Sequence, residues 1–131
     1  MLLYHQLWLS AFALTQLVEA PLYYWALSAQ RAPHLAAHHG PRWARVTRRA
    51  ALSLAPSAMT HPLLWMLWPA LMRPLGLSQW TLTCTGELLV WLTEGLMLWT
   101  LGLPHPWRWS LAANALSLLL FPLWRALTPL L

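Results

Sequence analysis

Four long apolar segments, separated by polar stretches, make up most of the chain. They run over about residues 2–27, 51–72, 79–101 and 109–131. Each covers the ~20 residues that a helix needs to cross the hydrocarbon core of a bilayer. None shows the strict alternation of a barrel strand, and only helices and closed barrels span lipid. The pattern therefore predicts an all-α, polytopic membrane protein whose four transmembrane helices form an antiparallel bundle.

The composition favours a membrane environment for a single domain. The chain has 131 residues, of which 59% are hydrophobic and 8% charged, whereas an ordinary soluble domain is about 25% charged. The predicted spans leave no room for a separate soluble domain, so we expect residues 1–131 to form one integral membrane domain. The first segment is not typical of a signal peptide, because no basic stretch precedes it. The single cysteine, Cys84, falls inside an apolar run and is expected to be buried.

Arginine placement predicts which ends of the spans face the cytoplasm. The connection over residues 28–50 holds most of the basic residues, which are Arg31, Arg42, Arg45, Arg48 and Arg49. Alternation of the spans puts this loop on the same side as Arg108, with Arg73 and Arg125 on the opposite side. Cytoplasmic loops carry an excess of arginine and lysine. We therefore expect both termini outside, in a multi-pass protein of the bacterial inner membrane.

The net charge of +5 raises the question of an acidic partner. Nucleic acid is not expected, because the chain has little polar surface on which to present a basic patch. The 28–50 loop is a candidate for binding anionic lipids, and the alternative is that its arginines only set the topology. With four spans, a transport pathway would need a homo-oligomer or a membrane-protein partner.

Ionisable side chains inside the predicted spans are the main functional signal. Each costs on the order of 2.5–3.5 kcal/mol at the centre of a span, and such residues usually face the bundle interior. The ionisable and strongly polar residues, in chain order, are Glu19, His61, Glu87, Glu94, Asn114 and Ser117. Apart from Glu87, they lie about 8–15 Å from the predicted cytoplasmic ends, at about 1.5 Å rise per residue. The expected catalytic or cation-binding site consists of Glu19, His61, Glu94 and Asn114, with Thr60 and Ser117 in support.

Glu87 is expected to have a different role. Folding the third and fourth spans about their short turn puts Glu87 level with Arg125, roughly 20 Å or more from the cytoplasmic end. A structural ion pair is predicted, since intramembrane charges usually find partners. Irregular backbone is expected near Glu19 and near His61, because Pro21 and Pro62 follow them. A proline releases the carbonyl four residues back, here those of Leu17 and Ala58. Such backbone is tolerated at membrane depth where it lines a cavity.

Three kinds of chemistry suit these residues. Glu19, His61 and Glu94 supply the ligands that a divalent metal such as Zn, Mn or Fe accepts, although no HExxH pair is present. A carboxyl group in low-dielectric surroundings can instead bind and release a proton near neutrality, as in transporters. In an intramembrane hydrolase acting on a peptide or lipid, a glutamate would activate water. The alternative is a non-catalytic subunit or assembly factor, in which the polar groups only hydrogen-bond the helices together.

Short motifs give the chain a resemblance to small bacterial four-helix membrane proteins of unassigned function. These motifs are EAP in the first span, THP in the second, ELLVWLTE in the third and NALS in the fourth. The resemblance covers most of the chain and implies no activity. The polar residues inside the spans, rather than this resemblance, set the expected function. It is that of a small multi-pass membrane protein whose buried Glu/His/Asn site binds a cation or protons, with transport as its use.

Overall fold

The described residues fold into four long helical rods, as the apolar pattern predicted. The computed structural model describes residues 2–28 and 41–127. The elements, in chain order, are α1 (Leu2–Ala26), α3 (Arg42–Pro62), a π-helical stretch (Leu63–Leu67), α4 (Trp68–Met72), a 3-10 turn (Arg73–Leu75), α5 (Gln79–Thr100) and α6 (Pro106–Leu127). Within the described ranges there is no strand, so the all-α class is confirmed.

Local sequence signals account for the ends and the irregular part of these rods. The Ser78 side chain caps α5, where its Oγ accepts a hydrogen bond of 3.1 Å from the Thr81 backbone N–H. Gly76 ends the preceding 3-10 turn at a φ of 68°, a left-handed conformation that glycine adopts without strain. The π-helical stretch joins α3 to α4 without a break and lies between Pro62 and Pro69. Neither proline has a backbone N–H, so the regular hydrogen-bond ladder is interrupted at both of its ends.

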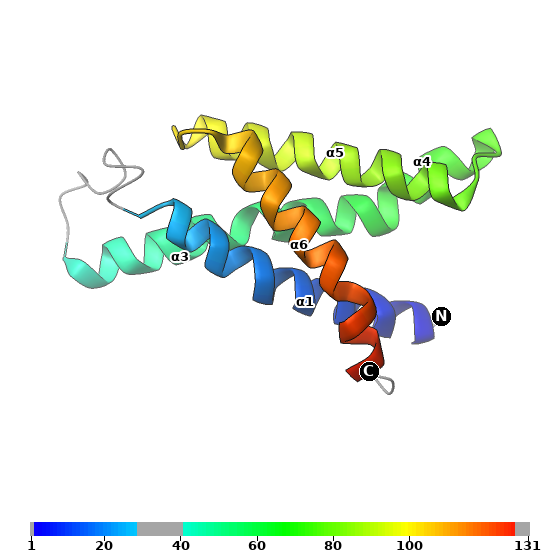
Figure 1. The fold of residues 1–131 in the computed structure, drawn as a ribbon, viewed down its shortest axis with the longest axis horizontal. Coiled ribbons are helices and arrows are strands. Elements are labelled where there is room, and N and C mark those ends of the chain that lie inside the picture. The colour runs from blue at the N-terminus through cyan, green and yellow to red at the C-terminus, as the bar shows by residue number, and fades with distance from the viewer. Residues whose placement is uncertain (1, 29–40, 128–131) are drawn as a thin grey trace.

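The rods form a ring in which each one packs against two neighbours. α1 contacts α3 and α6, and α5 contacts α6 and the rod formed by α3 and α4. α1 and α5 therefore lie across the ring from each other. Figure 1 shows α6 leaving the end of α5 and crossing obliquely toward the N-terminal half of α1. A hydrogen bond of 2.7 Å from Trp124 Nε1 to Ser10 Oγ joins α6 to α1 in that region.

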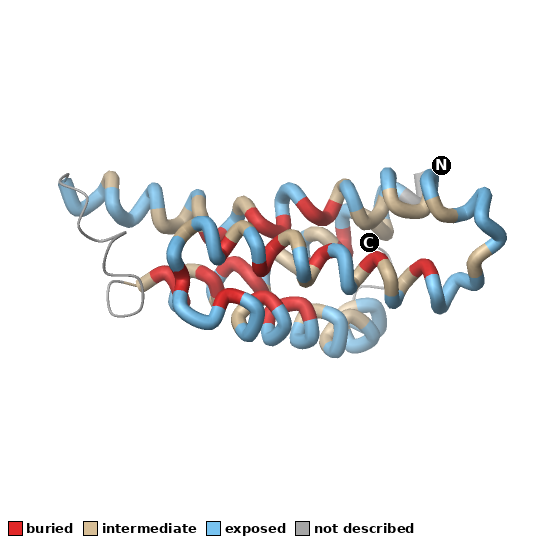
Figure 2. The backbone as a smooth tube through the Cα atoms, turned by 90° about the horizontal axis from the view of Figure 1, so that it is seen from above, coloured by how far each residue is buried: buried red, intermediate tan, exposed pale blue. Residues whose placement is uncertain are grey.

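An apolar cluster closes the end of the ring where α1 and α5 terminate. Its buried members are Tyr23, Ala26, Leu27, Leu98, Leu103 and Ala113. Arg49 ties α3 to the same end, because its Nε donates to the Tyr24 carbonyl at 2.5 Å and its guanidinium lies 3.8 Å from the centre of the Tyr24 ring. Figure 2 shows the buried segments concentrated in the middle of the bundle. We call the end with this cluster the closed end.

Large apolar side chains are exposed on every rod, while two glutamates are buried inside the bundle. Leu17, Leu71, Leu92 and Leu119, one on each rod, are between 44% and 75% exposed. Glu19 and Glu94 are only 1% and 0% exposed. Buried charged groups and exposed large apolar groups are the informative exceptions to ordinary soluble packing.

By length and mean hydropathy, α6 alone among the described helices qualifies as a membrane-spanning segment. It has 22 residues, and its most apolar window has a mean hydropathy of 1.4. This is weak support for membrane association. The four predicted segments are thus confirmed as four helices in the described part of the chain. That all four cross a membrane stays a prediction.

Two further expectations need correction. The predicted loop 28–50 is too long, because α3 begins at Arg42; residues 29–40 lie outside the described part of the chain. The boundary was drawn where the apolar run starts, whereas a helix that carries exposed arginines can extend beyond it. Arg42, Arg45 and Arg48 are exposed on these first turns of α3. Cys84, expected to be buried, is exposed on the outer face of α5.

Candidate functional site

Glu19 lies at the centre of the ring, on the inner face of α1. Its carboxylate accepts a hydrogen bond from Ser57 Oγ on α3 and another, of 2.8 Å, from Ser117 Oγ on α6. Both donors are neutral hydroxyl groups. A carboxylate can accept about four hydrogen bonds, so Glu19 keeps unused acceptor capacity.

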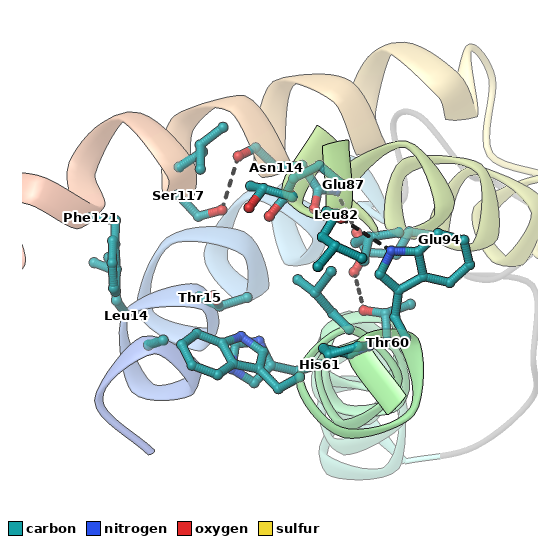
Figure 3. Close-up of a pocket in the computed structure, with 18 of the residues that line it drawn as sticks. Leu14, Thr15, Thr60, His61, Leu82, Glu87, Glu94, Asn114, Ser117 and Phe121 are labelled. Carbon is teal, nitrogen blue, oxygen red and sulfur yellow. Dashed lines mark hydrogen bonds between the residues drawn. The ribbon is translucent and has the colours of Figure 1, made fainter. Parts of the chain in front are cut away.

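Glu94 occupies the corresponding position on α5 and has three donors. Its Oε1 accepts from Thr60 Oγ1 at 2.7 Å, and its Oε2 accepts from Tyr23 Oη at 2.6 Å and from Asn114 Nδ2 at 2.8 Å. The Thr60 bond approaches from α3 and the Asn114 bond from α6, on two sides of the carboxylate (Figure 3). Tyr23 comes from α1, so the Glu94 carboxylate is bonded to all three other rods.

The two helices between the acidic residues each serve both carboxylates from a single turn. On α3, Ser57 donates to Glu19, and Thr60, three residues later, donates to Glu94. On α6, Asn114 donates to Glu94, and Ser117, three residues later, donates to Glu19. Residues three apart share one helix face, which explains how one turn reaches both groups. Glu19 and Glu94 are therefore joined through shared helix turns, and we call these two glutamates the acidic pair.

The donors are themselves held by the backbone of their helices. Asn114 Nδ2 donates also to the Ser110 carbonyl at 2.9 Å, and Ser110 Oγ donates to the Trp91 carbonyl on α5 at 2.9 Å. Ser117 Oγ lies 3.0 Å from the Asn114 carbonyl. These bonds join α6 to α5 and orient the Asn114 amide toward Glu94.

No cationic side chain neutralises the acidic pair within the described residues. All five hydrogen-bond donors to Glu19 and Glu94 are hydroxyl or amide groups. Burying an ionised carboxylate without a paired charge is costly, and a buried group of this kind is usually paired, metal-bound or neutralised. The acidic pair is thus suited to hold a positive charge from outside the chain, either a proton or a cation.

His61 lines the cavity beside the acidic pair, but its ring packs in an aromatic cluster. Its ring centre lies 6.2 Å from that of Trp8, 5.2 Å from that of Phe12 and 5.8 Å from that of Trp65. Its Nε2 lies 3.4 Å from the Trp8 carbonyl. The expected metal ligands Glu19, His61 and Glu94 are not gathered, since the described part of the chain holds no group of three or more His, Cys, Asp or Glu side chains that could bind a metal ion. The imidazole was expected to join the carboxylates because of its depth alone, and depth does not fix the direction of a side chain.

Glu87 and Arg125 are not brought together. Glu87 lines the cavity described below, whereas Arg125 is exposed near the end of α6, and no ion pair between them is found in the described ranges. The prediction assumed that α5 and α6 stay side by side along their whole length. α6 instead crosses to α1, where the neighbouring Trp124 bonds to Ser10, so Arg125 is carried away from α5.

A cavity of about 350 Å³ extends from the acidic pair away from the closed end. Its polar wall contains Glu19, Glu94, Thr60, Asn114 and Ser117. Its remaining wall is largely apolar and includes Leu14, Leu64, Trp65, Trp68, Leu82, Val90 and Phe121. Arg73 and Gln79 line it beside the turn that joins α4 to α5. Figure 3 shows Leu14 and Phe121 on the opposite side of this space from Thr60 and Glu94.

Sequence reasoning missed two members of the site. Ser57 lies one turn before Thr60, so the shared helix face could have identified it. Tyr23 lies one turn after Glu19, but its bond goes to Glu94 on the opposite helix, which no local spacing predicts. The site residues that depth and spacing predicted, and that do meet, are Glu19, Thr60, Glu94, Asn114 and Ser117.

Comparison with known proteins adds no family to this description. No protein-family model, no curated protein and no solved structure matches the chain. The geometry of the acidic pair and its cavity therefore carries the functional argument.

Proposed function

We propose that this chain is a small four-span membrane protein that binds a proton or a small cation at the acidic pair and uses it in transport. The observation that carries the proposal is that Glu19 and Glu94 are 1% and 0% exposed and are bonded only to neutral donors in the described residues. Ionisable residues of this kind inside membrane helices mark ion pathways and proton relays. These donors are neutral and supply no positive charge. A bound proton or cation would supply it.

A membrane location for all four rods is supported by their outer surfaces. Exposed large apolar side chains occur on every rod, with Leu17, Leu71, Leu92 and Leu119 as examples. In water such a surface would drive association, whereas in a bilayer it matches the solvent. The buried hydroxyl and carboxyl groups then fill the role of interhelical polar contacts.

The acidic pair and its five donors all come from one chain. The cavity extends from the pair to Arg73 and Gln79 beside the α4–α5 turn, while the apolar cluster fills the closed end. A site reached from one side at a time is the arrangement that a transporter alternates between its two faces.

Infrared difference spectroscopy of the protein in lipid nanodiscs tests ion binding directly. Wild-type protein is titrated with acid and, separately, with Na⁺ or Mn²⁺ over a choline background. We expect carboxyl bands that change on proton or cation binding, with part of the signal lost in Glu19→Gln and part in Glu94→Gln. The double variant should lose the whole cation-induced signal and keep only the acid-induced band of Glu87. The separate titrations tell a proton site from an alkali-ion or divalent-metal site.

The third acidic residue supplies a matched control. Glu87 lines the cavity but makes no hydrogen bond to the acidic pair in the described structure. Glu87→Gln should therefore keep the cation-induced bands of the other two carboxyl groups. A double Glu19→Gln, Glu94→Gln variant with the same cation response as the wild type would overturn the proposal.

A further inference from the structure

We propose that the cavity binds an amphipathic organic cation, a monovalent amine whose ammonium group meets the acidic pair while its apolar body fills the rest of the space. This inference rests on the proposed function, since the same two carboxylates hold the positive charge. It goes further by assigning the chemical class of the molecule that the cavity takes.

The size of the cavity is the first argument. A proton or a dehydrated metal ion needs no more room than a water molecule, whose share of liquid volume is about 30 Å³. The cavity beside the acidic pair measures about 350 Å³. That volume lies within the range of about 300–1,000 Å³ found for small-molecule pockets. The space is thus an order of magnitude larger than a bare ion requires.

The chemistry of the wall is the second argument. Trp65, Trp68 and Phe121 line the cavity together with leucine and valine side chains. Such a wall stabilises an apolar body by excluding water, and aromatic rings also attract ammonium groups through their π faces. Trp68 is fixed in place, because its Nε1 donates to the Leu82 carbonyl of α5 at 3.1 Å.

The charges in the cavity wall indicate that the polar head group of the ligand is cationic. Among the described residues, the cavity wall holds three carboxyl groups, those of Glu19, Glu87 and Glu94. Its basic side chains are the imidazole of His61 and one arginine, Arg73, beside the α4–α5 turn. A ligand carboxylate or phosphate at the end of the cavity formed by the acidic pair would be repelled by these acidic groups. An ammonium group has three donors and no acceptor, which matches carboxylates that retain unused acceptor capacity.

Three ligands with one apolar body and different head groups test the proposal. Phenylbutylamine, phenylbutanol and phenylbutyrate are titrated calorimetrically into protein in nanodiscs, and empty nanodiscs correct for partition into lipid. We expect the amine to bind at least about tenfold more tightly than the alcohol, a difference of about 1.4 kcal/mol, and the acid not to bind. Glu19→Gln and Glu94→Gln should each abolish most of this preference for the amine.

Two tryptophan variants separate cavity binding from general attraction to the protein. Trp65→Leu, in the cavity wall, should weaken amine binding several-fold without touching the hydrogen bonds of the acidic pair. Trp80→Leu is the matched control, because Trp80 is 79% exposed and lies outside the cavity lining. Trp65→Leu also keeps the test decisive if the glutamate variants fail to fold.

Equal binding of the amine and the alcohol, or no binding of the amine at all, would overturn this inference. If the infrared experiment still shows that Na⁺ or protons bind at Glu19 and Glu94, the proposed function survives and only the ligand class is wrong. If neither the amine nor a small ion affects the two carboxyl groups, both proposals fail together.

Discussion

Tyr23 joins two helices that otherwise lie on opposite sides of the ring. Its hydroxyl donates to Glu94 Oε2 at 2.6 Å, while the side chain as a whole is 0% exposed within the apolar cluster. A hydrogen bond to a charged group contributes about 1.5–3 kcal/mol, and removing its donor leaves a buried acceptor without water to replace it. Tyr23 thus couples the acidic pair to the packing of the closed end.

Replacing Tyr23 by phenylalanine removes this hydroxyl and leaves the ring in place. We expect Tyr23→Phe to lower the free energy of unfolding by about 1.5–3 kcal/mol, measured by denaturant titration in mixed micelles. Tyr24→Phe is the matched control, because it is the ring and backbone of Tyr24 that contact Arg49. Its change should stay within about 0.5 kcal/mol. Similar losses in the two variants would mean that the bond to Glu94 adds no stability.

The residues of the acidic pair differ in how far their roles could be predicted from the sequence. Depth and helix periodicity brought out Glu19, Glu94 and Asn114, because both depend on geometry within one helix. The partner of Tyr23 depends on which helices lie across the ring, and the order of helices in a ring is not encoded in any single span. His61 was placed at the correct depth, but its ring turns toward Trp8 and Phe12, because aromatic packing determined its orientation.

At the scale of elements, two glycines on α5 allow its neighbours to approach closely. A methyl group added at Gly95 would overlap the ring of Trp107 at the start of α6. One added at Gly86 would meet a terminal methyl of Leu64 and the ring of Trp68. Close helix approach over small residues is typical of packing in membranes, where no hydrophobic force draws helices together.

Gly95→Ala should therefore weaken the packing of α5 against α6. We expect a loss of about 1–3 kcal/mol in unfolding free energy, the usual cost of overpacking, because the ring of Trp107 cannot yield as a flexible chain can. The double variant Gly95→Ala, Trp107→Leu should recover part of that loss, since it removes the overlapping ring. Denaturant titrations of the single and double variants measure both effects, and an unaltered Gly95→Ala protein would contradict this account.

The elements themselves were predicted well where the apolar pattern defines them and poorly where it does not. The bounds of α1 and α5 follow the first and third apolar segments to within about two residues. α3 starts at Arg42 instead, because an exposed arginine-rich helix needs no apolar face on its first turns. Irregular backbone was expected beside Pro21 and Pro62. α1 continues as an α-helix through Pro21, whereas a π-helical stretch follows Pro62. That stretch contributes Leu64 and Trp65 to the cavity wall. Local helix propensity does not predict that these side chains line a cavity.

At the scale of the whole molecule, the central question is which solvent surrounds the four rods. Among the helices of the described residues, only α6 is long and apolar enough to qualify as a membrane span. Mean hydropathy is averaged over all sides of a helix and does not tell which side faces outward. The structure does distinguish the sides, because polar groups are buried and many leucines are exposed. The proposed bilayer around all four rods would account for this separation, because a lipid solvent favours apolar side chains outside and polar groups inside.

The single cysteine provides a direct test of this proposal. Cys84 is exposed on α5, about five residues or 8 Å from the helix start, at about 1.5 Å rise per residue. If the bundle spans a bilayer, Cys84 faces lipid, so a charged maleimide should not label it in nanodiscs and should label it after denaturation in detergent. A cysteine in place of Leu75, with Cys84→Ser, is the matched control, because Leu75 is 66% exposed in the α4–α5 turn.

The same pair of variants reports the direction of insertion. Positive-inside placement puts the α4–α5 turn on the outer side, so Leu75→Cys in intact bacterial spheroplasts should react with the charged maleimide without permeabilisation. Rapid labelling of native Cys84 in nanodiscs would mean that α5 lies in water, and the four-span arrangement would then be wrong. Labelling of Leu75→Cys only after permeabilisation would keep the four spans and reverse their orientation. The cavity, which reaches Arg73 beside this turn, would in that case take its ligand from the cytoplasmic side.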